Sequence, residues 1–174
     1  MKKGLLYFVA ITTVLMVTIA CEKDDICSDT PITPFMTIAF QNNDPNFNAP
    51  RAVSNLQVRL LENDSTFFAA PISSDTIRIP LRTLSEKTVF LFTRNVDDPN
   101  PANTATDTLS FTYTTENVFV NRACGFKTFY NDLSAEINEL RPENNTDSNN
   151  WIQQLEIINT TINDTPNTHI RLFH

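Results

Sequence analysis

Apolar and polar residues alternate with a period of two along most of this chain. Residues 36–40, 56–60 and 109–113 each place a large apolar side chain at every second position, with polar or small residues between them. Because the side chains of a β-strand point alternately to its two faces, this pattern is typical of strands with one buried face. Further predicted strands lie at residues 77–81, 118–120, 126–130, 151–158 and 169–173, and residues 90–93 are apolar on both sides, as in a central strand.

Polar connections rich in Asn, Asp and Pro separate these runs, at residues 41–50, 95–103 and 143–150. Pro80 marks the edge or the end of a strand, because proline cannot donate to a ladder. Many short strands with turn signals between them predict an all-β fold: an antiparallel β-sandwich, immunoglobulin-like or similar, of about seven to nine strands. We expect one such domain over residues 34–174.

Two features leave the local structure open. Leu133, Ile137 and Leu140 have helical spacing, and Pro142 follows them. The segment is short, so it forms either a single turn of helix or a further strand. Gly125 is the only glycine outside the first twenty residues, which predicts a positive φ, a bulge or the close approach of another backbone there. The other turns must then be made with Asn, Asp, Pro or Ser.

The first twenty residues predict a signal peptide. Lys2 and Lys3 give a basic start, an almost unbroken apolar run ends at Ala20, and the run is short for a membrane span. Cys21 follows the expected cut, which resembles the lipobox of bacterial lipoproteins, although Thr18 stands where those proteins prefer Leu. The resemblance implies that the thiol of Cys21 receives the lipid and that residues 21–33 form a tether. The alternative is an ordinary secretory signal beside a coincidental cysteine.

Three charged residues follow the lipidation site. Lys23, Asp24 and Asp25 resemble the export signal of Bacteroidota surface lipoproteins, which implies a lipid-anchored protein of the outer membrane that faces the cell surface. The alternative is a tether whose charges only keep it solvated.

Lipidation of Cys21 would leave Cys27 and Cys124 as an even pair outside the reducing cytosol. A disulfide between them would close a loop of about 97 residues, worth up to roughly 4–5 kcal/mol in the loop-entropy description. Two free thiols, one of them buried, are the alternative.

The charge and the residue types argue against several classes of function. The formal net charge is −7, and no basic stripe is present, so nucleic-acid binding is disfavoured. The only histidines, His169 and His174, lie in or after the last predicted strand, and no nucleophile is paired with a base. The acidic clusters at residues 42–44 and 97–100 lack the spacing of a calcium loop and are best interpreted as solvated turns. We expect no catalytic residues, no metal, no cofactor and no small-molecule substrate.

Three triplets, which contain Ser65, Thr76 and Thr108, resemble the O-glycosylation acceptor that Bacteroidota use on exported proteins. Each consists of Asp, then Ser or Thr, then a third residue. Such triplets also recur by chance in a chain rich in Asp and Thr, so each is a candidate only.

Several stretches taken together resemble an uncharacterised family of small Bacteroidota surface lipoproteins. They are the leader with Cys21, residues 107–113, residues 121–127 with the motif Arg-Ala-Cys-Gly, and residues 150–152. The resemblance implies an all-β lipoprotein that acts as a non-enzymatic accessory or structural partner of an outer-membrane β-barrel protein. The alternative is a module that binds glycans or another ligand through exposed aromatic residues, for which Phe47, Phe119 and Phe129 are candidates.

Overall fold

The computed structural model describes residues 33–44, 49–137, 150–163 and 166–174. The predicted signal peptide and nearly all of the tether lie outside these residues. Within the described ranges no helix has the length and apolar character needed to cross a bilayer. The strands are β1 (Met36–Gln41), β2 (Val53–Leu60), β3 (Ile72–Ser74), β4 (Thr76–Ile79), β5 (Lys87–Arg94), β6 (Ala105–Asn121), β7 (Gly125–Ile137), β8 (Gln154–Ile157) and β9 (Ile170–Phe173), with a 3₁₀ turn, η2 (Pro101–Asn103), before β6.

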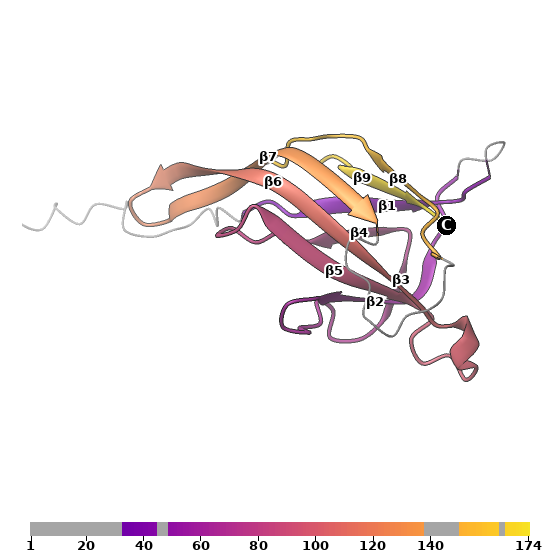
Figure 1. Cartoon of the computed structure of the whole chain (residues 1–174). Helices are drawn as coiled ribbons and strands as arrows, with labels where there is room; N and C mark the ends of the chain where they lie inside the picture. Colours follow the sequence, from indigo (N-terminus) through magenta and orange to yellow (C-terminus); the bar gives the residue numbers. More distant parts are fainter. Residues whose placement is uncertain (1–32, 45–48, 138–149, 164–165) are drawn as a thin grey trace, which may run out of the picture. The chain divides into compact units, whose positions relative to one another are not determined.

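The strands form two sheets, which confirms the predicted β-sandwich (Figure 1). One sheet has the order β4-β1-β9-β8 and the other the order β3-β2-β5-β6-β7. The chain falls into two compact units, of which residues 33–118 and 128–174 make one; residues 119–127, the tip of the β6–β7 hairpin, belong to the other. Both sheets lie in the first unit, apart from the ends of β6 and β7 at this tip.

One strand pair departs from the predicted antiparallel arrangement. β1 and β9 run parallel, with Ile38 opposite Ile170 and Phe40 opposite Leu172. Thr37 and His169 extend the pairing by two bonds of 3.0 Å: the backbone N–H of His169 donates to Thr37 O, and the N–H of Thr37 donates to Nδ1 of His169. The imidazole thus takes the place of a backbone acceptor just before the start of β9.

The core lies between the two sheets, and it contains the inward side chains that the alternation predicts. Met36, Ile38 and Phe40 of β1 face Leu109 and Phe111 of β6 in one cluster of buried residues. Trp151 and Ile152 connect the sheets just before β8. The indole Nε1 of Trp151 donates to Phe92 O at 3.0 Å, and the N–H of Ile152 donates to Oδ2 of Asp107 at 2.7 Å. The strand predicted from residue 151 therefore begins only at Gln154.

Two positions in the strands shift the phase of the alternation. Asn55 in β2 has a φ of 43° and lies where the pairing of β2 with β3 changes register. The extra residue of this irregularity allows Val53 and Leu56, three positions apart, both to point into the core. Asp132 in β7, with a φ of 55°, stands in the same way between the buried side chains of Tyr130 and Leu133.

The helical spacing around Leu133 belongs to a strand, in which Leu133, Ala135 and Ile137 alternate with the exposed Ser134 and Glu136. The structure has strand there, up to Ile137, and Leu140 lies outside the described residues. Pro80 directly follows β4, as predicted for a strand end. Gly125 has a φ of 71°, which confirms the predicted positive φ, and a Cβ atom would meet nothing there within 4 Å, so close approach is not the reason. The described non-glycine residues with positive φ are all Asn or Asp.

We expect the left-handed backbone at Asn55 to limit substitution. Asn55→Gly should leave stability nearly unchanged, whereas Asn55→Ala should lower the free energy of unfolding by about 1 kcal/mol, because a Cβ without a polar group is strained at positive φ. Urea unfolding of the two variants measures the difference. Equal midpoints for the two would contradict this explanation of the register shift.

Candidate functional site

The chain crosses from one sheet to the other at Leu81 and Arg82, between β4 and β5. Two tyrosines of the second sheet hold this crossing segment. The hydroxyl of Tyr130 donates to Leu81 O, and the hydroxyl of Tyr113 donates to Arg82 O, each at 2.9 Å. The two rings pack edge to face with centroids 5.0 Å apart. Two backbone carbonyls that leave the sheet ladders thereby gain a hydrogen bond, which the buried peptide group of Leu81 requires.

Thr88 of β5 closes the hydrogen bonds into a ring. The N–H of Arg82 donates to Oγ1 of Thr88 at 3.1 Å, and that hydroxyl lies 2.5 Å from the hydroxyl of Tyr113. Since the single proton of the Tyr113 hydroxyl goes to Arg82 O, the Thr88 hydroxyl is the donor to Tyr113. Each group in the ring donates and accepts once, an arrangement in which the bonds polarise one another. We call these five residues, Leu81, Arg82, Thr88, Tyr113 and Tyr130, the tyrosine bracket.

Burial raises the pKa of both phenols. For Tyr130 the second cause is the nearby Tyr113, and for Tyr113 the hydrogen bonds from Thr88 and to Arg82 offset part of the increase. Both hydroxyls therefore remain protonated donors at neutral pH. The raised pKa also couples stability to pH, because the unfolded chain loses these protons first as the pH rises.

We predict that the stability contributed by the bracket is fully present below about pH 10, the pKa of an unfolded tyrosine, and is lost above it. Tyr113 and Tyr130 are the only tyrosines after Tyr7, so phenolate absorbance of the leaderless folded protein reports on them alone. No ionisation should appear near pH 10 before unfolding. Tyr130→Phe should lower the free energy of unfolding by about 1–3 kcal/mol, because it leaves Leu81 O unpaired. Two phenols that titrate normally in the folded protein would contradict the bracket.

Two adjoining hollows flank the crossing segment. The narrow pocket has a volume of about 170 Å³, and the wide depression about 430 Å³. Leu60, Arg82 and Thr88 line both. The narrow pocket is otherwise formed by Ser65, Thr66, Phe67, Pro80, Leu81 and Phe90, and the wide depression by Leu61, Glu62, Ser85, Lys87 and Val89.

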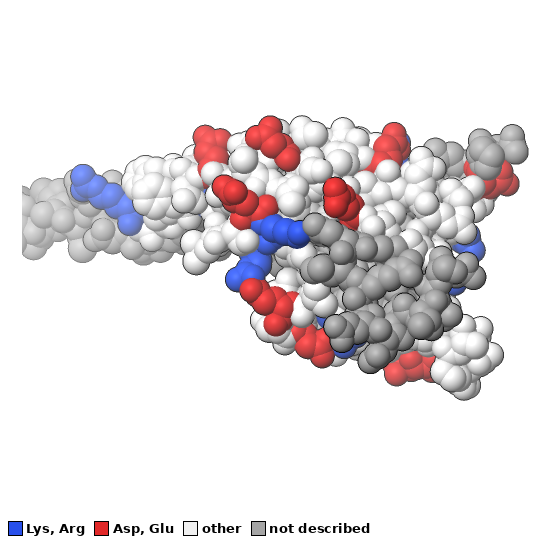
Figure 2. All heavy atoms as spheres, viewed as in Figure 1, with Lys and Arg blue, Asp and Glu red and all other residues white. Residues whose placement is uncertain are grey.

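The narrow pocket is too small for most organic ligands, whose sites are roughly 300–1,000 Å³, and it fits a single apolar side chain better. The wide depression falls within that range and carries charge, because Arg82 forms an ion pair with Glu62 at its wall. Leu84, between the lining residues Arg82 and Ser85 in sequence, is 96% exposed. Elsewhere, acidic side chains are spread across the face shown in Figure 2.

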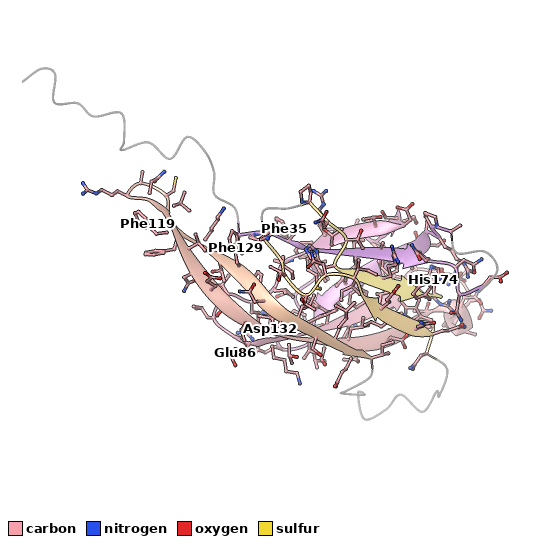
Figure 3. All side chains as sticks on the ribbon, turned by 90° about the horizontal axis from the view of Figure 1, so that it is seen from above. Phe35, Glu86, Phe119, Phe129, Asp132 and His174 are labelled. Carbon is pink, nitrogen blue, oxygen red and sulfur yellow. The ribbon has the colours of Figure 1, made fainter. Side chains whose placement is uncertain are left out.

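The β6–β7 hairpin tip carries a second exposed apolar feature. Phe119 and Phe126 are 55% and 66% exposed, and their rings contact each other edge to face at 5.3 Å. Figure 3 shows Phe119 projecting from this hairpin. The turn is held by Asn121, whose Oδ1 accepts from the N–H of Cys124 at 2.7 Å. Phe119 was a predicted candidate; its partner Phe126 was missed, although its place one residue after the turn glycine could have identified a cross-strand pair.

Both histidines serve the fold. His169 is 2% exposed and accepts the bond from Thr37 described above. The ring of His174 packs edge-on against Phe40 and Trp151, and its Nε2–H donates to Arg51 O at 3.2 Å. Burial lowers the pKa of both imidazoles, so both are neutral at neutral pH.

The structure places the other predicted site residues as follows. Ser65 and Thr76 are both exposed. Ser65 lies in the loop between β2 and β3, and Thr76 is the first residue of β4. Thr108 is 3% exposed, which argues against this hydroxyl as a glycan acceptor in the folded protein, because the sheet buries it opposite Leu91. Phe129 is half-buried. Cys21, Lys23, Asp24, Asp25, Cys27 and Phe47 lie outside the described residues, so the lipid, the export signal and the Cys27–Cys124 bridge stay predictions.

Among the described residues, no group of three or more His, Cys, Asp or Glu is placed to hold a metal ion. The chain matches the profile of a family of unknown function, DUF6452, over residues 55–174, which is more than half of its length. It therefore belongs to this family. No curated protein and no solved structure matches the chain.

Proposed function

We propose that this DUF6452 protein is a lipid-anchored protein of the outer-membrane surface that acts, without catalysis, as a partner of an integral β-barrel protein. The address rests on the sequence: the leader that ends at Ala20, the lipobox-like Cys21, and the charged triplet from Lys23 to Asp25. The Arg-Ala-Cys-Gly motif at residues 122–125 adds the likeness to Bacteroidota surface lipoproteins. A triacylated cysteine carries more than one chain, which suffices for stable anchoring.

The observation that carries the partner role is the exposure of Leu84, which follows Arg82, a lining residue of the narrow pocket, by two residues in the chain. The tyrosine bracket fixes the backbone on one side of the pocket, so the cavity is formed before any partner arrives. A preformed apolar pocket can accept an apolar side chain from a partner, and an exposed leucine on the same crossing segment can contact that partner. The histidines support a non-catalytic role, because the contacts of both rings are those of structural residues.

Leu84→Ser tests this surface. Its side chain is almost fully exposed, so the substitution should change stability by less than about 0.5 kcal/mol. After mild-detergent extraction of native membranes, we expect the wild type to co-purify one barrel protein in near-stoichiometric amount. Leu84→Ser should recover at least about fivefold less, which corresponds to roughly 1 kcal/mol of binding.

Ile158→Ser is the matched control, because Ile158 is also an exposed aliphatic residue, beyond the end of β8. It should retain the barrel protein. Equal loss in both variants would assign the effect to general hydrophobicity and would contradict the surface. A protein that leaves native membranes as a monodisperse monomer would contradict the partner role.

One observation favours a second candidate function, a ligand-binding module. The wide depression has the volume of a ligand site, and Arg82 and Lys87 lie in its lining. The aromatic candidates for glycan binding give it no support, since the lining residues named above include neither Phe119 nor Phe129. Saturable glycan binding by the isolated protein that is lost in Lys87→Ala would favour this function over the first.

We also propose the disulfide between Cys27 and Cys124. It would join the tether to the turn that Asn121 holds, at the start of β7. Protein matured through the envelope should contain no alkylatable thiol, and Cys124→Ser should free one thiol at Cys27. Intact-mass analysis after alkylation without a reductant decides this; two modified cysteines in the folded wild type would refute the bridge.

A further inference from the structure

The hairpin tip, residues 119–127, combines exposed aromatic rings with positive charge. Phe119 and Phe126 form one continuous apolar surface, since each ring is more than half exposed and the two are in contact. Arg122, in the turn between them, is exposed. Lys127 is the other charged residue of the segment, which contains no Asp or Glu although the whole chain has a net charge of −7. The tip is thus a small basic segment in an acidic protein.

Aromatic rings beside Lys or Arg are the side chains that lie well at the boundary between lipid and water. The rings enter the headgroup region, and the cations remain at the level of the phosphates. Anionic lipids attract such cations, and they repel the acidic remainder of the chain. Charge therefore favours a lipid surface as the occupant of this tip, and it favours the tip over the rest of the protein as the part that contacts lipid.

The tether supplies the proximity, and here the inference rests on the proposed function. Cys27 follows the lipidated Cys21 by only about six residues, which span at most roughly 20 Å. The disulfide to Cys124 adds about 6 Å between Cα atoms. The hairpin turn would therefore be confined close to the bilayer that holds the anchor. A confined patch has a high effective concentration, so a contact that would be weak in free solution is occupied.

We propose that the hairpin tip rests on the anionic lipid surface of the membrane that holds the anchor, with Phe119 and Phe126 in the headgroup region and Arg122 at the phosphates. Lipid contact at the tip is distinct from the protein contact proposed at Leu84, and each has its own readout.

Tryptophan reporters test the proposal in the full lipidated chain. Trp151 is the only native tryptophan, and it is buried, so it provides an unquenched baseline. Phe119→Trp places a reporter on the tip, and Leu84→Trp places a matched reporter at an exposed apolar position outside the tip. Each protein is reconstituted into vesicles of phosphatidylcholine and phosphatidylglycerol, with plain or brominated acyl chains. Intact mass confirms the lipid and the oxidised cysteines beforehand.

We expect brominated lipid to quench about half of the fluorescence that the introduced tryptophan adds in Phe119→Trp. In Leu84→Trp it should quench little of the added fluorescence. Adding Arg122→Glu to the Phe119→Trp protein should reduce the quenching, whereas Arg78→Glu, on the exposed side of β4, should not. Equal quenching at both reporter positions, or none at position 119, would overturn the proposal.

The vesicles contain no barrel protein, so quenching at position 119 is independent of the partner. If brominated lipid does not quench the reporter at position 119 while the barrel protein still co-purifies, only the lipid contact is overturned. A mass that shows Cys21 without lipid would overturn both the anchor and this inference. If the tip instead binds a barrel protein, Phe119→Ser will abolish co-purification while the reporter stays unquenched in vesicles.

Discussion

The hydrogen-bond ring at the crossing segment is the interaction on which the two-sheet arrangement depends. Where the chain leaves β4 and enters β5, the buried carbonyl of Leu81 and the partly buried carbonyl of Arg82 accept from Tyr130 and Tyr113 and not from a ladder partner. An unpaired carbonyl there would cost about 1–3 kcal/mol. The two phenols remove that cost and also fill the space beneath the crossing. The same ring forms a wall of the narrow pocket, so the stability of the sandwich and the shape of its contact surface have a common source.

The near absence of glycine gives this sandwich its second constraint. Left-handed residues are needed wherever a strand changes phase, and the chain uses Asn and Asp for them. At Asp132 the side chain also stabilises the shift, because Oδ2 accepts from the hydroxyl of Thr114 at 3.1 Å. An Asn or Asp side chain tolerates the torsion and offers polar atoms to its surroundings, which glycine does not. The phase shift at Asp132 is consequently anchored to the neighbouring strand β6.

The sequence was sufficient for the class of fold and for local features that one residue determines. Alternation identified the core strands, Pro80 marked the end of β4, and Gly125 indicated a positive φ. The sequence was insufficient where a feature depends on two segments that are far apart in the chain. Neither the parallel pairing of β1 with β9 nor the bonds from Tyr113 and Tyr130 to residues 81–82 leaves a local pattern. Thr108 shows the same limit, because alternation predicted a polar outer face for β6 and could not tell that this hydroxyl is buried.

The parallel pairing of β1 and β9 affects when the protein can fold. β1 lies between β4 and β9, so its sheet stays incomplete until residues 166–174 are present. Pairing of segments so far apart is slow, because loop closure must precede any gain from the contact. Because the chain is synthesised from the amino end, β1 is complete long before its partner. A chain that cannot complete this sheet early remains incompletely folded for longer.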